Sequence, residues 1–218
     1  MRIVAAMPRK TNEPPGPIAR FRRHEHLTRS GEVQDSIFCI EEGWVGRYTL
    51  LGAGRRQITA LYLPGDYCEP QWIIRPRSTE SIVALTPVRA WRKPVVRLTE
   101  ADRYSPESRE LIGALPKIIE RQSAWIIALG RKTALERIST LMVEFMERLK
   151  AGGRGQGERF PMPLTQTEIG DVVGLTPIHV NRVMKDLKTR GIIEVKRRFV
   201  TVHDQAKLRA IADSDQLH

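Results

Sequence analysis

Short apolar stretches broken by glycine and proline are the main pattern in the first half of the chain. Four such stretches follow residue 20, at 36–41, 44–51, 57–63 and 81–85. Turn residues such as Gly52 and Pro64 separate them. Runs of strand length at this spacing are typical of an antiparallel roll or sandwich. We therefore predict an all-β domain over residues 20–104, preceded by a flexible, proline-rich tail at residues 1–19.

A helical pattern begins at Ser105, which can cap a first turn that Pro106 opens. Because Pro116 interrupts this pattern, we expect a break or kink near Leu115. Six positions follow the 4, 3, 4, 3, 4 spacing of a coiled-coil seam: Leu111, Leu115, Ile118, Gln122, Trp125 and Leu129. We interpret residues 105–132 as a dimerisation helix in which Gln122 sets the register. The alternative is a helix that lies on the β-domain of its own chain.

A second helix is expected directly after the first. Gly130 closes the first helix, and Thr133 with Glu136 forms a capping box that starts the next one. A helix end beside a fresh N-cap is a natural hinge, so we place the hinge at Lys132 and Thr133. The rest of the chain, residues 133–218, is then a separate C-terminal domain.

Two short helices around a glycine turn are expected within this domain. Thr165 and Glu168 form another capping box, and Gly174 ends the helix that they start. Thr176 and Pro177 then supply the N-cap and the first position of a further helix. The polar positions of this helix share one side: His179, Asn181, Arg182, Lys185 and Lys188. The arrangement predicts a helix-turn-helix.

A cationic hairpin follows the second of these helices. Residues 192–195 and 199–202 have the pattern of two strands, which predicts a β-wing. Its tip has three cations: Lys196, Arg197 and Arg198. Between residues 177 and 198, seven Lys or Arg stand against Asp186 and Glu194, in a chain whose formal net charge is +11. A merely solvated basic surface would not gather its cations on one helix face and one hairpin tip.

This placement of charge predicts a DNA-binding surface. Phosphate contacts supply affinity that falls with salt, and a helix in the major groove reads the bases. Arg182 is the expected base reader, because its planar guanidinium matches the O6 and N7 acceptors of guanine. Thr165 and Gln166 stand at a helix N-terminus, where backbone amides suit a phosphate.

Composition argues against several other classes of protein. Two cysteines, Cys39 and Cys68, are too few for a disulfide scaffold, a four-thiolate zinc site or a four-cysteine iron–sulfur cluster. None of the five histidines lies between residues 34 and 91, so the β-domain lacks the ligands of a metal-dependent enzyme, and we expect no enzyme activity. We read His24 and His26 as solvated side chains rather than haem ligands. With no run of 18 apolar residues and no export signal, we expect a cytoplasmic protein that does not enter the membrane.

Four segments resemble the Crp/Fnr family of bacterial transcription regulators: Glu42-Gly43-Trp44, Leu63-Pro64-Gly65-Asp66, residues 164–170 and residues 180–184. The resemblance covers nearly the whole chain after residue 20. It implies an α+β fold with an N-terminal antiparallel β-roll (double-stranded β-helix), a long central dimerisation helix and a C-terminal winged helix-turn-helix. It also implies a homodimer that binds a palindromic site on double-stranded DNA and contacts RNA polymerase. A shift at the hinge would set the spacing of the two recognition helices, about 34 Å for one turn of DNA.

In this family, residues at the positions of Pro177, Ile178 and Arg182 read DNA. Only Arg182 keeps the charged type usual there, so the preferred DNA site should differ from that of the best-known members. With the resemblance included, the expected DNA-binding residues are Thr165, Gln166, Thr176, Pro177, Ile178, His179, Asn181, Arg182, Lys185, Lys196, Arg197 and Arg198.

The β-domain departs from the members of the family that bind cyclic nucleotides. No Gly-Glu pair follows Gly65-Asp66, and Arg77-Ser78 comes a few residues too early for the pair that holds the cyclic phosphate. We therefore expect neither cyclic AMP nor any other cofactor, and the effector is left open. The oxygen-sensing branch of the family uses four cysteines, which this chain lacks. An alternative function is a small-ligand module that regulates a partner protein, but it would leave the cationic helix unexplained.

Overall fold

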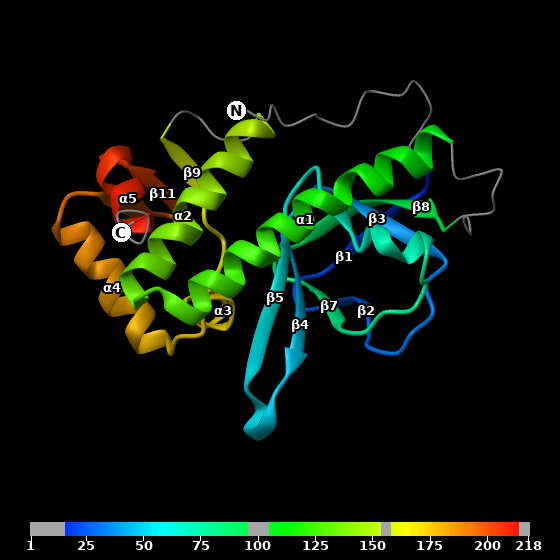
Figure 1. The fold of residues 1–218 in the computed structure, drawn as a ribbon, viewed down its shortest axis with the longest axis horizontal. Coiled ribbons are helices and arrows are strands. Elements are labelled where there is room, and N and C mark those ends of the chain that lie inside the picture. The colour runs from blue at the N-terminus through cyan, green and yellow to red at the C-terminus, as the bar shows by residue number, and fades with distance from the viewer. Residues whose placement is uncertain (1–15, 96–104, 154–157, 214–218) are drawn as a thin grey trace. The chain divides into compact units, whose positions relative to one another are not determined.

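The structure is a computed structural model that describes residues 16–95, 105–153 and 158–213. It divides into two compact units, with the boundary between Gln122 and Ser123. This boundary falls inside the first long helix, whereas the sequence pattern places the hinge at Lys132 and Thr133. Figure 1 shows the strands of the N-terminal part and the helices of the C-terminal part. No helix in the described segments is long and apolar enough to cross a membrane.

The N-terminal unit is an antiparallel β-roll, as predicted. Its strands within the described residues are β1 (Ile18–Phe21), β2 (His26–Thr28), β3 (Ser36–Glu42), β4 (Val45–Leu50), β5 (Arg56–Tyr62), β6 (Tyr67–Cys68), β7 (Ser81–Ala84) and β8 (Val88–Pro94). They form two four-stranded sheets, in the orders β1-β8-β3-β6 and β2-β7-β4-β5. Two short 3-10 turns, Gly52–Gly54 and Pro70–Ile73, interrupt the strand sequence.

The core of the roll is built from branched and aromatic side chains of both sheets, residue types that suit a pleated, half-buried surface. Ile37 of β3 and Ile82 of β7 are fully buried, and they come from different sheets. Trp72, from the turn Pro70–Ile73, is 1% exposed and belongs to the same core. The turn therefore contributes a large side chain to the interior.

The helix α1 (Pro106–Arg131) begins at the expected cap, where the Oγ of Ser105 accepts the Ser108 N–H at 3.1 Å. Of the break or kink expected near Leu115, the break is wrong, because the helix continues through Pro116. Pro116 deprives the Ile112 carbonyl group of its usual donor. Both residues lie on the exposed side of the helix, where water can replace that donor.

The first turns of α1 pack on the roll of their own chain. Leu111 is 4% exposed and belongs to the roll core. Glu110 accepts hydrogen bonds from Tyr67 at 2.6 Å and from Lys93 at 2.9 Å. The expectation that Leu111 faces a partner helix is therefore wrong, since the roll already buries this side chain.

The C-terminal unit has helices on a small sheet. Its elements are α2 (Ala134–Ala151), β9 (Arg159–Pro161), α3 (Gln166–Val173), α4 (Pro177–Thr189), β10 (Ile193–Lys196), β11 (Phe199–Val202) and α5 (Gln205–Ala212). The three strands pair in the order β10-β11-β9. The capping box that starts α2 is formed as predicted, with the Thr133 N–H donating to the Glu136 carboxylate at 2.7 Å.

The residues of the expected hinge are held by the C-terminal unit. The Lys132 ammonium donates to Thr140 Oγ1 of α2 at 3.1 Å and to the Ala212 carbonyl of α5 at 2.6 Å. The Lys132 carbonyl accepts from Arg137 Nε at 2.8 Å. The chain thus leaves the helical conformation at Lys132, but the side chain of this residue is anchored.

Candidate nucleic-acid interface

The helix-turn-helix consists of α3 and α4, which lie next to each other in the C-terminal unit (Figure 1). A capping box starts α3: Thr165 Oγ1 accepts the Glu168 N–H at 3.1 Å, and Glu168 accepts the Thr165 N–H at 2.7 Å. Glu168 is only 2% exposed, so the box is part of the folded core as well as a helix cap. This leaves Thr165 and Gln166 exposed at the helix N-terminus.

Two glycines give the turn between the helices its shape. Gly174 ends α3 in the left-handed conformation, with φ of +68°, which glycine adopts without strain. A Cβ atom on Gly170 would lie 2.4 Å from the Leu175 carbonyl oxygen. Only glycine at this position therefore allows the turn to fold back so closely on α3.

The helix α4 has one buried and one exposed side. Thr176 caps it by accepting the His179 N–H at 3.3 Å, and Pro177 occupies its first position. Val180, Val183 and Leu187 are buried against the rest of the unit. The exposed side presents Pro177, Ile178, His179, Asn181, Arg182, Lys185 and Lys188.

The wing is a hairpin of β10 and β11 in which Lys196 pairs with Phe199. Its two central residues, Arg197 and Arg198, have φ of +47° and +64°. Two consecutive left-handed residues match the twist of a tight hairpin, but asparagine and glycine adopt this conformation much more readily than arginine. The guanidinium of Arg159 lies 4.3 Å from the centre of the Phe199 ring, beside the turn of the wing.

The cations of this surface fall into two groups, those that form an ion pair and those that form none within the described segments. Arg190 pairs with Asp186 at 2.9 Å, and Lys196 pairs with Glu194 at 2.6 Å. The hydrogen bond from Lys196 lowers the pKa of the Glu194 carboxyl. Five further cations form no ion pair within the described segments: Arg182, Lys185, Lys188, Arg197 and Arg198. These five are available to an external anion.

All the residues expected to bind DNA are exposed, and all belong to the C-terminal unit. The expected dimer residues behave differently. Leu115, Ile118, Gln122, Trp125 and Leu129 are half-buried in the single chain. Trp125 donates its indole N–H to Glu144 of α2 at 2.8 Å, so it already has a partner within the chain.

The exposed side of α1 presents instead an apolar stripe that the sequence interpretation missed. Ile112, Ile119 and Ile126 recur every seven residues and are 38%, 61% and 72% exposed. Ile127, beside them, is 57% exposed. The seven-residue repeat of these isoleucines is visible in the sequence, one position after the predicted seam. The pattern alone does not show which of the two adjacent stripes is buried within the same chain.

A buried ion cluster lies in the roll. The guanidinium of Arg47 on β4 contacts the Glu69 carboxylate at 2.8 Å and the Glu80 carboxylate at 2.9 Å. Tyr62 also donates to Glu69, and Thr59 donates to Glu80 at 2.7 Å. Burial, followed by the charge of Glu69, raises the pKa of Tyr62 well above its ordinary value. Sequence analysis missed this cluster, because its members come from four separate segments.

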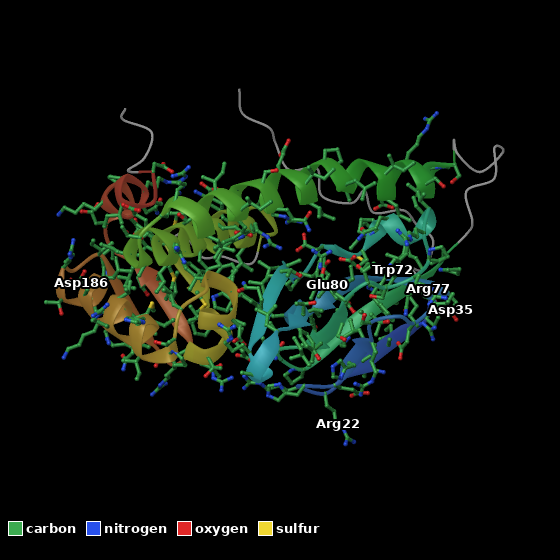
Figure 2. All side chains as sticks on the ribbon, turned by 60° about the horizontal axis from the view of Figure 1, so that its bottom comes forward. Arg22, Asp35, Trp72, Arg77, Glu80 and Asp186 are labelled. Atoms are coloured by element: carbon green, nitrogen blue, oxygen red, sulfur yellow. The ribbon has the colours of Figure 1, made fainter. Side chains whose placement is uncertain are left out.

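Arg77 and Ser78 bond to separate carbonyl groups of the roll. Arg77 is exposed at the outer edge of the roll, where it donates to the Gly31 carbonyl at 2.8 Å (Figure 2). Ser78 is buried, and its hydroxyl donates to the Glu80 carbonyl at 2.6 Å. The two side chains therefore have separate structural partners.

The remaining candidate ligand residues also have structural roles. Cys39 pairs with Tyr67 and Phe38 with Cys68 across β3 and β6, which places the two thiols on opposite faces of the sheet. Burial raises the pKa of Cys39 to about 11. His26 bonds Tyr48 through Nε2 at 2.8 Å, and burial lowers its pKa.

Comparison with known proteins agrees with this architecture. The model of the Crp-like helix-turn-helix domain matches residues 136–211, and the model of the cyclic nucleotide-binding domain matches residues 18–101. The transcriptional activator protein Anr of Pseudomonas aeruginosa is 28% identical over 193 residues, which cover 88% of this chain and 79% of Anr. The nitrogen fixation regulation protein FixK of Bradyrhizobium diazoefficiens is 29% identical over 211 residues, covering 89% of this chain and 86% of FixK.

A solved structure gives the same result. FixK2 from Bradyrhizobium japonicum superposes with a TM-score of 0.79 at 26% identity, over 89% of this chain and 96% of that one. The fold and the exposed cationic helix define a winged-helix DNA-binding regulator of transcription with an N-terminal sensor-type roll. Within that class, the chain belongs to the Crp/Fnr family.

Proposed function

We propose that this regulator acts as a homodimer on a palindromic site in double-stranded DNA, without a cyclic nucleotide. The observation that carries the proposal is the exposed side of α4 with the wing beside it, where five cations have no ion-pair partner in the described segments. A surface of this kind suits the phosphates and base edges of a duplex.

In the proposed complex, α4 enters the major groove with its N-terminal turns against the bases. Arg182 contacts guanine through its two parallel N–H donors. Lys185 and the wing cations contact phosphates, which position the protein without reading the sequence. The exposed N-terminus of α3, at Thr165 and Gln166, faces a further phosphate.

The proposed dimer uses the exposed stripe on α1. Ile112, Ile119 and Ile126 lie a heptad apart, and Pro116, Ser123 and Gly130 each follow one of them by four residues. The short side chains of Ser123 and Gly130 allow two helices to approach closely. A second copy would remove this apolar stripe from water, which supports a symmetric helix pair.

The roll is proposed to work without cyclic AMP. A cyclic phosphate needs a free arginine and convergent donors. Here Arg47 is held by Glu69 and Glu80, and Arg77 lies on the outside of the roll. The carboxylates of Glu69 and Glu80 already supply Arg47 with the negative charge that a bound anion would bring.

A contact with RNA polymerase and a place in the bacterial cytoplasm complete the proposal. Both follow from the family, since a Crp/Fnr regulator acts on transcription at the chromosome. The small-ligand module acting on a protein partner is the alternative, and it gives no role to the unpaired cations of α4.

Selection of bound duplexes from a random pool tests this function. The full-length protein should enrich a palindrome whose half-sites lie about 34 Å apart, with an affinity that falls as salt rises. Arg182→Ala should weaken binding by roughly 1–3 kcal/mol and relax one base position. Arg75→Ala, which removes an exposed arginine of the roll, is the matched control and should leave binding unchanged. Binding without any enriched sequence would contradict the proposal.

A further inference from the structure

Ile178 is the most exposed large apolar side chain in the described part of the chain, with 81% of its surface open. It stands at the second position of α4, directly after Pro177. Its side chain has no packing role, because Val180, Val183 and Leu187 fill the buried side of the helix. An isoleucine placed in this way contributes nothing to the core, although isoleucine is among the residue types most often buried.

The start of α4 holds this side chain in a defined direction. Thr176 caps the helix through the His179 N–H, and the ring of Pro177 restricts the backbone of the first turn. A β-branched side chain in a helix has one strongly preferred χ1 rotamer. Contact with a partner would therefore cost Ile178 little conformational entropy.

We propose that Ile178 recognises a thymine in the DNA site by contact with the C5-methyl group, an inference that rests on the proposed DNA-binding function. The first turn of a recognition helix is the part that meets base edges. Pro177 and Ile178 cannot form side-chain hydrogen bonds, so polar base edges gain nothing from them. The thymine methyl is the apolar group that the major groove offers, and apolar side chains recognise it.

The position of this thymine follows from the helix geometry. Ile178 and Arg182 are four residues apart, so their side chains are neighbours on the exposed face. Four residues rise about 6 Å along a helix, and successive base pairs are about 3.4 Å apart. The thymine therefore lies within about two base pairs of the guanine that Arg182 reads, on either strand.

Deoxyuridine substitution tests the contact, because it removes the methyl group and keeps the base pair. In the selected site, each thymine is replaced in turn, and the dissociation constant of the full-length protein is measured at fixed salt. For the wild type, one thymine per half-site should show about fourfold weaker binding, the effect expected for one buried methyl group. Ile178→Val should keep this sensitivity, whereas Ile178→Ala should bind the thymine and uracil duplexes equally.

Ile74→Ala removes an isoleucine of similar exposure from the roll and should behave like the wild type. Each variant is judged by its own ratio of uracil to thymine affinity, so a partly unfolded preparation does not change the result. An equal ratio for the wild type and Ile178→Ala, or the lack of any sensitive thymine, would overturn the methyl contact while leaving DNA binding intact. If the protein selects no sequence at all, both the methyl contact and the proposed DNA-binding function are wrong.

Discussion

Arg197 and Arg198 have an unfavourable backbone conformation at the tip of the wing, where both have positive φ and both are exposed. A left-handed arginine costs of order 1–2 kcal/mol. The Arg198 carbonyl accepts the Met162 N–H at 2.8 Å, but neither arginine side chain forms an ion pair in the described segments. Strain of this kind at an exposed cationic site suggests a role in binding rather than in folding.

Replacing Arg197 by Asn and Arg198 by Gly should therefore separate stability from function. The free energy of unfolding should rise by about 1–2 kcal/mol, because both new residues accept the turn conformation. DNA affinity should fall for all sequences alike, with a shallower dependence on salt. Thermal unfolding and salt titrations measure the two effects. The double lysine variant keeps charge and strain, so its stability should match the wild type; a stability gain there would contradict this account.

Arg47 is paired with two carboxylates, the buried Glu69 and the half-buried Glu80. Arg47→Met should lower the free energy of unfolding by about 3–5 kcal/mol, since it leaves buried negative charge without a partner. Adding Glu69→Gln and Glu80→Gln should recover much of this loss. Chemical denaturation measures the changes, and Arg55→Met, at an exposed position, is the control. Equal losses for Arg47→Met and the triple variant would show that charge pairing is not the cause.

At the scale of the element, α1 shows how a helix can have two apolar stripes with different roles. The stripe that includes Leu111 packs on the chain itself, and the stripe that includes Ile126 remains exposed. The two stripes are one residue apart along the sequence. An amphipathic pattern identifies the helix, but the burial of each side depends on what packs beside it.

Ile126→Glu should convert the dimer to a monomer, because it places a charge at the centre of the proposed helix pair. Its effect on the folding of one chain should be small, since the side chain is 72% exposed. Sedimentation equilibrium measures the mass, and affinity for the palindromic site should fall with it. Ala124→Glu introduces the same residue at another exposed position of α1, off the stripe, and should remain dimeric. A monomeric Ala124→Glu, or a dimeric Ile126→Glu, would place the interface elsewhere.

At the scale of the whole molecule, the two units differ in the kind of information that specifies them. The helix-turn-helix was predictable because its signals are local: the caps at Thr165 and Thr176 each act within three residues, and Gly174 ends its own helix. For the roll, the sequence predicts an antiparallel β-class but not the order of the strands. Register and pairing there join segments far apart in the sequence, such as β1 with β8.

Local sequence signals are sufficient to predict an antiparallel roll, the long helix, and the cationic winged helix with its exposed face. These features follow from caps, turns and periodicity, which act over a few residues. The signals do not predict that Leu111 belongs to the roll, that Ile126 remains exposed, or that Arg47 pairs with Glu69 and Glu80. Burial and charge pairing depend on which distant segments of the chain come together, and no local pattern specifies that.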